Sequence, residues 1–372
     1  MQEPNVTCRR CVMDTSASNI TFDKEGYCNF CSEFLNRSRH ILNCSSQERE
    51  VLRNKFIQKV KTEGRGQSYD CIIGVSGGVD SSWALVKAID LGLRPLAVHM
   101  DNGWNSELAQ NNISNIVTKL GVDLYTHVID WDEYRDLMNA FFDADVIDVE
   151  LLYDNAMLAV NYKLAAEHKT KYILSGSNQS TEGIRMPAGW NWFKRDKRNI
   201  RSIAHRHGVR SMRTFPAMGV LDHIKYEVIK KIQWISFLDY FEYEKELAVK
   251  ELVEHYSYKP YPYKHYESVF TRFYQGYILP KKFAVDKRRL HLSTLVSTGQ
   301  LSRDEAVASL GTSPYPSPQA LEQDIRYFLK KMRWSQQQLD KYLARPEKPH
   351  SDYATEKPAW EFLKKAYNIL NR

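Results

Sequence analysis

Short apolar runs alternate with longer amphipathic stretches over the middle of the chain. Four runs of strand length lie at residues 69–75, 94–101, 124–130 and 171–176. Between them, apolar side chains recur at helical spacing over residues 81–91, 107–120 and 155–168. Short buried strands that alternate with helices are typical of βαβ units and a parallel sheet. We therefore predict an α/β fold with a doubly wound parallel sheet, and we expect ligands at the carboxyl ends of its strands.

The pattern differs on both sides of this central region. Residues 1–45 form a cysteine-bearing head, and residues 46–66 show amphipathic spacing that predicts a connecting helix. The core is expected to span residues 67–215, followed by a mostly helical region over residues 216–372. Within that last region, the strand pattern fades and residues 222–256 are expected to be helical.

Three details of the last region have local consequences. Ser302 followed by Glu305 predicts a capping box that opens a helix. Ser317 before Pro318 predicts an N-cap with proline at the first helical position. Residues 256–266 (YSYKPYPYKHY), which include a candidate catalytic histidine at position 265, are too rich in Pro and Tyr for a regular element. This segment is either a lid that excludes water from a site or an ordered surface loop.

Composition fits a globular protein of two or three domains. The chain has 372 residues, of which 43% are hydrophobic and 26% charged, which excludes a fibre or a disordered tail protein. It has no apolar run near the roughly 18 residues of a membrane span and no signal-peptide pattern, so we expect a cytoplasmic location. With 52 Lys and Arg against 45 Asp and Glu, the net charge of +7 suits phosphate-bearing small molecules as well as nucleic acid.

Four of the six cysteines lie in the first 31 residues, as two Cys-x-x-Cys pairs separated by 16 residues. The four are Cys8, Cys11, Cys28 and Cys31. In a chain without a secretory signal, such spacing favours metal ligands over disulfides or unrelated buried thiols. Four thiolates around one Zn²⁺ leave no open position, so the predicted zinc site is structural.

A Gly- and Ser-rich turn follows the first apolar run and opens a helix. It consists of Ser76, Gly77, Gly78, Val79, Asp80, Ser81 and Ser82. Such glycines let backbone N–H groups approach phosphate oxygens, and the helix N-terminus favours an anion. Asp80 could position Mg²⁺ or order the loop. Because no lysine follows the turn, as it would in a Walker loop, we expect pyrophosphate binding without γ-phosphate transfer rather than a simple tight turn.

This run, turn and helix resemble those of the PP-loop ATP pyrophosphatases, a HUP-like superfamily that includes GMP synthetase, NAD synthetase, asparagine synthetase and tRNA thiolases. The resemblance implies that a substrate oxygen is adenylated by ATP, pyrophosphate leaves, and a nitrogen or sulfur nucleophile displaces AMP. It also implies nucleotide contacts after the second and fourth runs, at His99, Met100, Asp101, Gly176, Ser177 and Asn178. Ser177 stands where relatives usually have histidine.

Candidate acidic residues lie in two further segments of the core. Sulfur-transferring relatives often carry Cys-x-x-Cys near residues 149–154, whereas this chain has Glu150 and Asp154 there. Glu182 follows the fourth run. With Asp80, these three carboxylates are the predicted catalytic acids, which either bind Mg²⁺ or orient ammonia.

A narrower resemblance rests on residues 175–183 (SGSNQSTEG), 264–268 (KHYES) and 279–293 (LPKKFAVDKRRLHLS), together with the cysteine head. In combination they look like the N-acetyl sugar amidotransferases of bacterial surface-polysaccharide (O-antigen or flagellin glycan) biosynthesis. Those enzymes convert the acetamido group of a nucleotide-linked (UDP) sugar into an acetamidino group. Beside a phosphate loop, the basic residues become candidate phosphate clamps, although a solvated helical face would show the same pattern. These are Lys282, Lys287 and Arg288.

An amidine needs ammonia, yet neither remaining cysteine suits a glutaminase. Residue 2 is Gln, Cys71 lies inside the first apolar run, and Cys44 lies in a polar connector. Ammonia is therefore expected from a separate glutaminase. The resemblance implies a partner similar to the amidotransferase subunit of histidine biosynthesis, with or without a cyclase-like companion, docked on the head or the C-terminal region.

The sequence also allows alternatives for one aromatic segment and for the function. The aromatic residues within 189–193 (GWNWF) could face a sugar ring or uracil, or pack in the core. A tRNA-modifying enzyme of the thiolase or lysidine type would share the loop and the head, but the absent mid-chain Cys-x-x-Cys disfavours it. A zinc-ribbon scaffold that binds nucleotide without turnover is the non-enzymatic alternative.

Overall fold

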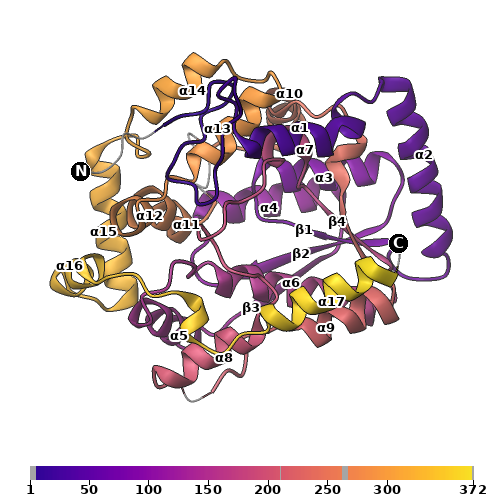
Figure 1. Cartoon of the computed structure of the whole chain (residues 1–372). Helices are drawn as coiled ribbons and strands as arrows, with labels where there is room; N and C mark the ends of the chain where they lie inside the picture. Colours follow the sequence, from indigo (N-terminus) through magenta and orange to yellow (C-terminus); the bar gives the residue numbers. More distant parts are fainter. Residues whose placement is uncertain (1–5, 210, 262–266, 371–372) are drawn as a thin grey trace.

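The computed structural model describes residues 6–209, 211–261 and 267–370, and its centre is a five-stranded sheet of order β3-β2-β1-β4-β5 (Figure 1). The strands are β1 (Cys71–Gly74), β2 (Pro95–Asp101), β3 (Leu124–Val128), β4 (Tyr172–Ser175) and β5 (Gln233–Ser236). Every neighbouring pair is parallel. The chain builds outward from β1 to β3 and then crosses to β4 and β5. The point between β1 and β4, where a ligand crevice is expected, is the switch point of the doubly wound sheet.

The central strands are buried on both faces, as the continuous apolar runs predicted. Alternate residues point to opposite sides, so Ile72 and Ile173 join one core while Cys71, Ile73 and Leu174 join the other. Helices α3 and α4 cover one face and α5 and α6 the other (Figure 1). The helices of this region are α3 (Val79–Asp90), α4 (Glu107–Leu120), α5 (Trp131–Asp143), α6 (Leu151–Glu167), α7 (Gln179–Glu182) and α8 (Lys197–Arg206).

Two strands differ from the sequence-based expectation. β3 was expected to be a buried strand, but it lies at the sheet edge and Val128 is 61% exposed. The expected helix over residues 222–256 is wrong, because β5 lies within it. The observed elements are α9 (Val220–Ile224), the π-helical η1 (Lys225–Ile229), β5, the 3-10 helix η2 (Phe237–Tyr240) and α10 (Lys245–Tyr256). β5 has only four residues, of which Gln233 and Ser236 are polar, so the sequence shows no strand pattern there. The strand forms because its backbone pairs with β4.

The head and the connecting helix form as expected. Helix α1 (Asn29–Leu42) begins at Cys28, and α2 (Ser46–Glu63) begins at a capping box of Ser45 and Glu48 and ends before Gly64. Phe56 and Val60 of α2 pack into the sheet core that also holds Cys71. The connecting helix is therefore part of the layer that covers one face of the sheet.

The C-terminal region is helical, as predicted. Its elements are α11 (Val269–Phe273), the π-helical η3 (Tyr274–Ile278), α12 (Leu279–Phe283), α13 (Arg288–Ser297), α14 (Arg303–Leu310), α15 (Pro318–Met332), α16 (Gln336–Ala344), the 3-10 helix η4 (His350–Asp352) and α17 (Lys357–Leu370). The capping box of Ser302 and the N-cap of Ser317 are both confirmed. The candidate catalytic histidine at position 265 lies outside the described residues. Across the described part of the chain, the helices are too short or too polar to traverse a bilayer.

Candidate active site

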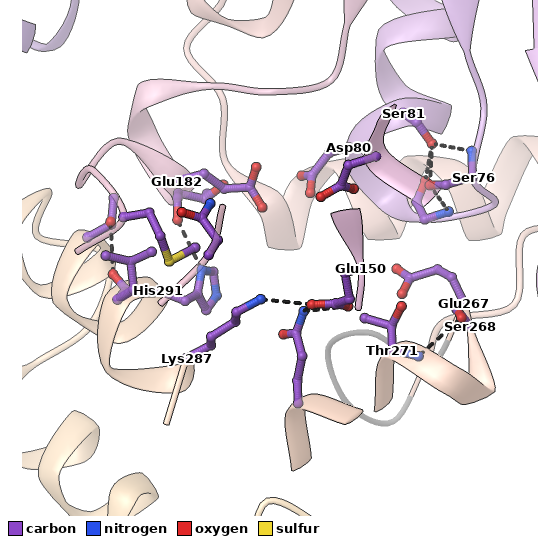
Figure 2. Close-up of a pocket in the computed structure, with 18 of the residues that line it drawn as sticks. Ser76, Asp80, Ser81, Glu150, Glu182, Glu267, Ser268, Thr271, Lys287 and His291 are labelled. Atoms are coloured by element: carbon purple, nitrogen blue, oxygen red, sulfur yellow. Dashed lines mark hydrogen bonds and ion pairs between the residues drawn. The ribbon is translucent and has the colours of Figure 1, made fainter. Parts of the chain in front are cut away.

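A cavity of about 740 Å³ opens at the carboxyl ends of β1 and β4. Its walls come from the turn after β1, the segment from α7 to residue 186, the start of α6, and helices α11 and α13. Four predicted site regions thus meet in one place. The predicted residues that line it are Gly78 and Asp154, together with Ser76, Asp80, Ser81, Glu150, Glu182 and Lys287, which are labelled in Figure 2.

The turn after β1 is held by its own serine hydroxyls. Ser81 Oγ accepts a hydrogen bond from the Ser76 backbone N–H at 3.2 Å and donates to the Gly78 carbonyl at 3.2 Å. The Gly78 N–H donates to Ser76 Oγ at 3.3 Å. No side chain caps the N-terminus of α3. The first N–H groups of this twelve-residue helix can therefore donate to an anion in the cavity.

Glycine is required where this turn meets its neighbours. Gly77 has φ +80°, and a Cβ there would lie 2.6 Å from the Ala109 carbonyl oxygen. A Cβ on Gly176 would lie 2.5 Å from the Asp80 carbonyl carbon, so β4 and the start of α3 approach too closely for any side chain. Gly176 therefore contributes by close backbone approach rather than by lining the cavity.

Two carboxylates face each other beside the turn of residues 76–82, the predicted phosphate loop. Figure 2 shows Asp80, from α3, pointing toward Glu182, from α7. The Tyr243 hydroxyl donates to Asp80 Oδ1, and the pKa of Tyr243 is raised by burial and by the nearby carboxylates of Asp80 and Glu182. Because this hydroxyl stays protonated, it can orient Asp80 through its hydrogen bond.

Glu150 is held by two donors at the cavity floor. Lys287 Nζ lies 2.8 Å from Glu150 Oε2, and Gln275 Nε2 lies 3.0 and 2.9 Å from the two carboxylate oxygens. Gln275 belongs to the π-helical turn η3, and Lys287 precedes α13. Gln275 and Lys287 of the C-terminal region therefore fix the orientation of the Glu150 carboxylate, which belongs to the core.

Asp154 belongs to a second charged group, built around Lys194. The Lys194 ammonium lies 2.6 Å from the buried Asp148 and 2.8 Å from Asp154. Burial raises the pKa of Asp154, reinforced by the charges of Asp148 and Glu150 against the opposing effect of Lys194. Burial also acts to raise the pKa of Asp148, but Lys194 and Lys287 outweigh it and lower that pKa. Asp154 therefore keeps a proton to a higher pH than Asp148 does.

Several predicted nucleotide contacts lie beside the cavity rather than in its lining. Val79 and Ser82 are buried residues of α3, and Met100 is in the core. His99 Nδ1 bonds the Val75 carbonyl at 2.9 Å. Three more form hydrogen bonds that shape the adjoining turns, namely Asp101, Ser177 and Asn178. Gly77 and Gly176 permit close packing of the backbone instead.

The structure does not bring Lys282 or Arg288 to the cavity. Lys282 Nζ, whose side chain is 0% exposed, contacts Asp145 at 3.1 Å and the carbonyls of Tyr342 and Arg345. Arg288 pairs with Asp286 and donates to carbonyl oxygens at the end of α14. Lys282 therefore joins α12 to Asp145 of the core and to the end of α16, Arg288 joins α13 to the end of α14, and neither side chain belongs to the cavity lining.

The aromatic side chains within residues 189–193 also point elsewhere. Trp190 is 3% exposed and donates to the Ser16 carbonyl of the head. Trp192 stacks on His350, and Phe193 stacks on Trp360. Only the polar member of this segment, Asn191, lines the cavity.

Further polar residues of the lining were not predicted as site residues from the sequence. Among them are Arg37, Asn102, Asn105, Arg185, Lys194, Lys245, Glu267 and His291. Three of these had a usable signal: Asn102 directly follows the second predicted strand, and Glu267 and His291 lie in the stretches 264–268 and 279–293. Glu267 reaches the loop because residues 267–269 pair with residues 104–106.

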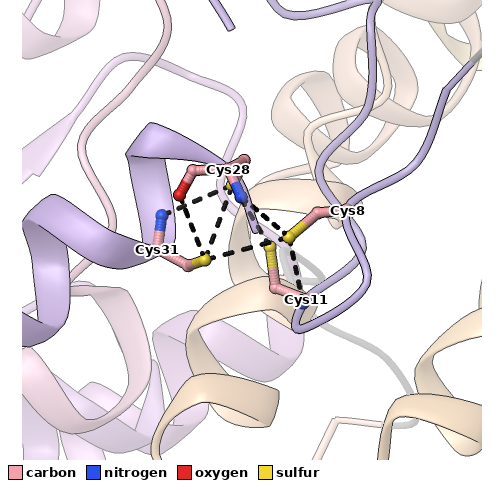
Figure 3. Close-up of side chains that lie close together, drawn as sticks. All are labelled: Cys8, Cys11, Cys28 and Cys31. Atoms are coloured by element: carbon pink, nitrogen blue, oxygen red, sulfur yellow. Dashed lines mark hydrogen bonds between the residues drawn. The ribbon is translucent and has the colours of Figure 1, made fainter. Parts of the chain in front are cut away.

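The head brings its four cysteines together in a cluster that could hold a metal ion (Figure 3). All four are buried, and their sulfur atoms lie within 4.8 Å of one another. Sulfur separations of 3.6 Å for Cys11–Cys28 and Cys28–Cys31, and 3.9 Å for Cys8–Cys31, match the roughly 3.8 Å edge of a tetrahedron with 2.3 Å metal–sulfur bonds. The donor set fits a single ion such as Zn²⁺.

This metal site rests against the cavity wall. Arg303 donates to the Cys8 and Cys11 carbonyls, and Arg289 pairs with Asp14 at 2.9 Å. Ser293 Oγ accepts the Val12 N–H at 3.1 Å. These contacts join the head to α13 and α14, and α13 also carries the cavity residues Leu290, His291 and Thr294.

Part of the C-terminal region is similar to a known protein family. Residues 267–367 match a family described as "LPS biosynthesis protein WbpG-like, C-terminal domain". The matched part contributes nine residues to the cavity lining, among them Glu267, Gln275, Lys287 and His291. No curated protein matches the chain significantly.

Solved structures resemble the chain only distantly. The U34-tRNA thiolase NcsA from Methanococcus maripaludis with its [4Fe-4S] cluster is 13% identical, covers 82% of this chain and 88% of its own, and gives a TM-score of 0.33. An NH3-dependent NAD synthetase from Campylobacter jejuni is 15% identical, with 73% and 99% covered and a TM-score of 0.29. NMN synthetase from Francisella tularensis is 15% identical, with 59% and 98% covered and a TM-score of 0.27.

Proposed function

We propose that this protein is an ATP-dependent amidotransferase of bacterial surface-glycan synthesis. It would convert the acetamido group of a UDP-linked N-acetyl sugar into an acetamidino group, with AMP and pyrophosphate as the other products. One observation carries the proposal: the phosphate loop shares its cavity with carboxylates and with side chains of a segment that matches a lipopolysaccharide-biosynthesis domain.

The proposed reaction has two steps. The acetamido oxygen attacks the α-phosphorus of ATP, the bond to the bridging oxygen of pyrophosphate breaks, and an imidoyl-AMP forms. Ammonia then adds to the activated carbon, and cleavage of the carbon–oxygen bond releases AMP with the original acetamido oxygen. The product amidine keeps a proton as an amidinium ion. Amide oxygens are weak nucleophiles, so positioning and charge neutralisation must supply most of the acceleration.

The chain's residues divide this work. The N–H groups at the start of α3 and the hydroxyls of Ser76 and Ser81 would bind the departing pyrophosphate. Asp80 and Glu182 would hold Mg²⁺ together with phosphate oxygens, since nucleotide-bound Mg²⁺ usually takes one or two carboxylates, and the ion would neutralise charge on the leaving group. Asp154, with its raised pKa, would accept a proton as ammonia adds.

Ammonia would come from a separate glutaminase, similar to the amidotransferase subunit of histidine biosynthesis and with or without a cyclase-like companion. Cys71 is fully buried in β1, and burial raises the pKa of its thiol. Cys44 does not line the cavity, so neither thiol is suited to attack glutamine. The isolated protein is therefore expected to use ammonium and not glutamine.

An isotope experiment tests the proposal. The protein is incubated with ATP, ammonium and UDP-N-acetyl sugars labelled with ¹⁸O in the acetamido group, and AMP is analysed by mass spectrometry. We expect the label in AMP, with pyrophosphate formed in equal amount. Formation of ADP, AMP formation that requires RNA, or no nucleotide consumption would contradict the proposal; the last two outcomes would favour the tRNA-modifying and scaffold alternatives, respectively.

The variant Asp80→Ala tests whether the turn after β1 is needed for the reaction. We expect it to abolish pyrophosphate release while the metal content of the head stays unchanged. Asp90→Ala is the control, because Asp90 ends the same helix and pairs with Lys87 on the surface. Equal turnover in both variants would remove Asp80 from the mechanism.

A further inference from the structure

Two arginines line the cavity on the side formed by the α7 segment. Arg37 comes from α1 of the head, and Arg185 follows α7 by three residues. Figure 2 shows Glu182 and His291 on the side of the cavity opposite Ser76 and Ser81. Arg37 Nη2 donates to the carbonyl of Gly183, next to Glu182, at 2.6 Å. The arginine pair therefore belongs to the wall that faces the phosphate loop.

One face of α1 fixes this wall. Ser38 Oγ donates to Gln179 Oε1 at 2.7 Å, and Phe34 lies so close to Gly183 that a Cβ there would meet its ring at 2.0 Å. Spacing of three and four residues places the contacting side chains on one side of the helix. They are Phe30, Glu33, Phe34, Arg37 and Ser38.

Arg185 is oriented before any ligand arrives. Its Nε lies 2.6 Å from Glu33 Oε2, and its guanidinium carbon lies 4.5 Å from the centre of the Phe30 ring. Phe30 stands between Cys28 and Cys31, so the metal knuckle supports the ring on which Arg185 rests. Glu33 contacts Nε and Nη2, which leaves Nη1 available to donate to another acceptor.

Within the cavity lining, Arg37 differs in its charge balance from Arg185, Lys194 and Lys287. Each of those three cations lies within 3 Å of a carboxylate oxygen. Among the residues that the structure describes, Arg37 forms no ion pair with a carboxylate. A guanidinium with spare donors matches phosphate geometry bidentately, and Met186 and Leu290 add apolar surface to the same lining.

We propose that Arg37 and Arg185 form a second anion subsite, which binds the diphosphate of the nucleotide-linked acceptor while the phosphate loop binds ATP. The inference rests on the proposed function for the identity of the acceptor. It gives the cysteine head a direct part in substrate binding: α1 supplies one arginine and orients the other. Separate anion subsites keep the two diphosphates from competing for one set of donors.

Binding of two probes tests the subsite. UDP probes the acceptor side, and an ATP analogue with a methylene bridge between the α and β phosphates probes the loop; both are measured by isothermal titration calorimetry. In Arg37→Gln and Arg185→Gln we expect UDP affinity to fall at least about tenfold, as loss of a charge-assisted contact implies. Affinity for the ATP analogue should change less than about twofold.

Two controls separate binding from structure. Arg39→Gln makes the same change on an exposed residue of α1 that does not line the cavity, and it should leave both affinities unchanged. Metal content and melting temperature, measured on every variant, show whether the head has stayed intact. Arg37→Gln is preferred to alanine because the amide can still donate toward the Gly183 carbonyl.

Each other outcome overturns the subsite. It fails if wild-type protein does not bind UDP, if the glutamine variants bind UDP normally, or if they lose the ATP analogue instead. The proposed function fails separately. If UDP binding depends on Arg37 but no acceptor gives AMP, the proposed function is wrong and the subsite is still supported. If Arg37→Gln forms labelled AMP with an unchanged KM for the acceptor, the subsite alone is wrong.

Discussion

At the scale of single residues, environment separates side chains that look alike in the sequence. Lys282 and Lys287 lie five positions apart in one basic stretch, yet one is enclosed by carbonyls and Asp145 while the other reaches Glu150 in the cavity. The same holds for the acids. Glu150 has two strong donors, whereas Asp154 shares Lys194 with Asp148.

Asp154 should control the pH dependence of turnover. Its raised pKa means that the base form is lost at a higher pH than for an ordinary aspartate as the solution is acidified. We expect kcat/KM for ammonia to fall on the acid side of neutrality. Asp154→Asn should lower kcat by about 10² to 10⁴-fold and remove that acid limb.

Lys194→Met serves as the companion variant for Asp154. It removes the cation that lowers the pKa of Asp154, so the acid limb should move to higher pH. A pH–rate profile of Asp154→Asn that is lower but keeps its shape would show a structural role instead.

Lys282 should matter for stability and not for nucleotide binding. Lys282→Ala leaves the buried Asp145 with Arg345 as its remaining partner, and removing one member of a buried ion pair costs about 3 kcal/mol. Urea unfolding should show this loss while KM for ATP stays unchanged. A large rise in KM for ATP with unchanged stability would return Lys282 to the site.

At the scale of elements, the site depends on how strand ends and helix starts meet. The turn after β1 and the segment after β4 touch through Gly176, whose missing side chain allows contact with the backbone of Asp80 and Ser81. The C-terminal helices close the cavity, because residues 267–269 pair with residues 104–106 and η3 presents Gln275 to Glu150. π-helical turns such as η3 are frequent at functional sites.

Gly176→Ala tests this contact. The added methyl group would collide with the backbone at the start of α3, so we expect ATP binding to weaken by at least about tenfold as that helix shifts. Gly74→Ala is the matched control. It lies at the end of β1, and its methyl group would meet its nearest neighbour, Asn161, at an ordinary 3.7 Å. Similar ATP binding in both variants would show that the contact between β4 and α3 is dispensable.

At the scale of the whole molecule, the cysteine head supports one wall of the cavity. Its cysteine cluster lies at the start of α1, and α1 packs on the α7 segment. His291 of α13 and Thr298 at its end hydrogen-bond to the same segment. Loss of the ion should therefore propagate to the cavity along these contacts.

Removal of the metal should loosen a defined part of the fold. After chelation, or in Cys28→Ser, we expect faster amide hydrogen exchange in α1 and residues 179–186 and a lower melting temperature. The amide hydrogens of β1 and β2 should stay protected from exchange, because these strands pair with each other inside the central sheet and not with the head. Exchange that rises equally everywhere would mean that the head stabilises the fold globally, and unchanged exchange at 179–186 would break the proposed connection.

The sequence by itself determined the features that depend on local chemistry. Apolar runs and helical spacing predicted four of the five strands and the connecting helix, and cap motifs predicted the helix starts at Ser302 and Ser317. The sequence also indicated the Gly- and Ser-rich turn after β1 and the grouping of the four cysteines, whose phosphate and metal binding stay predictions. In each case a few adjacent residues carry the whole physical requirement: a positive φ, a helix cap, or thiolates at a fixed spacing.

Tertiary structure alone decided which distant side chains share the cavity. Arg37, Lys194 and Glu267 come from three separate regions, and only packing brings them beside Asp80. Packing also excluded Lys282 and Arg288, and it made a strand of residues 233–236 because β4 offered an unpaired edge. Burial and partner choice are properties of the folded chain as a whole, and the local pattern around each of these residues does not contain them.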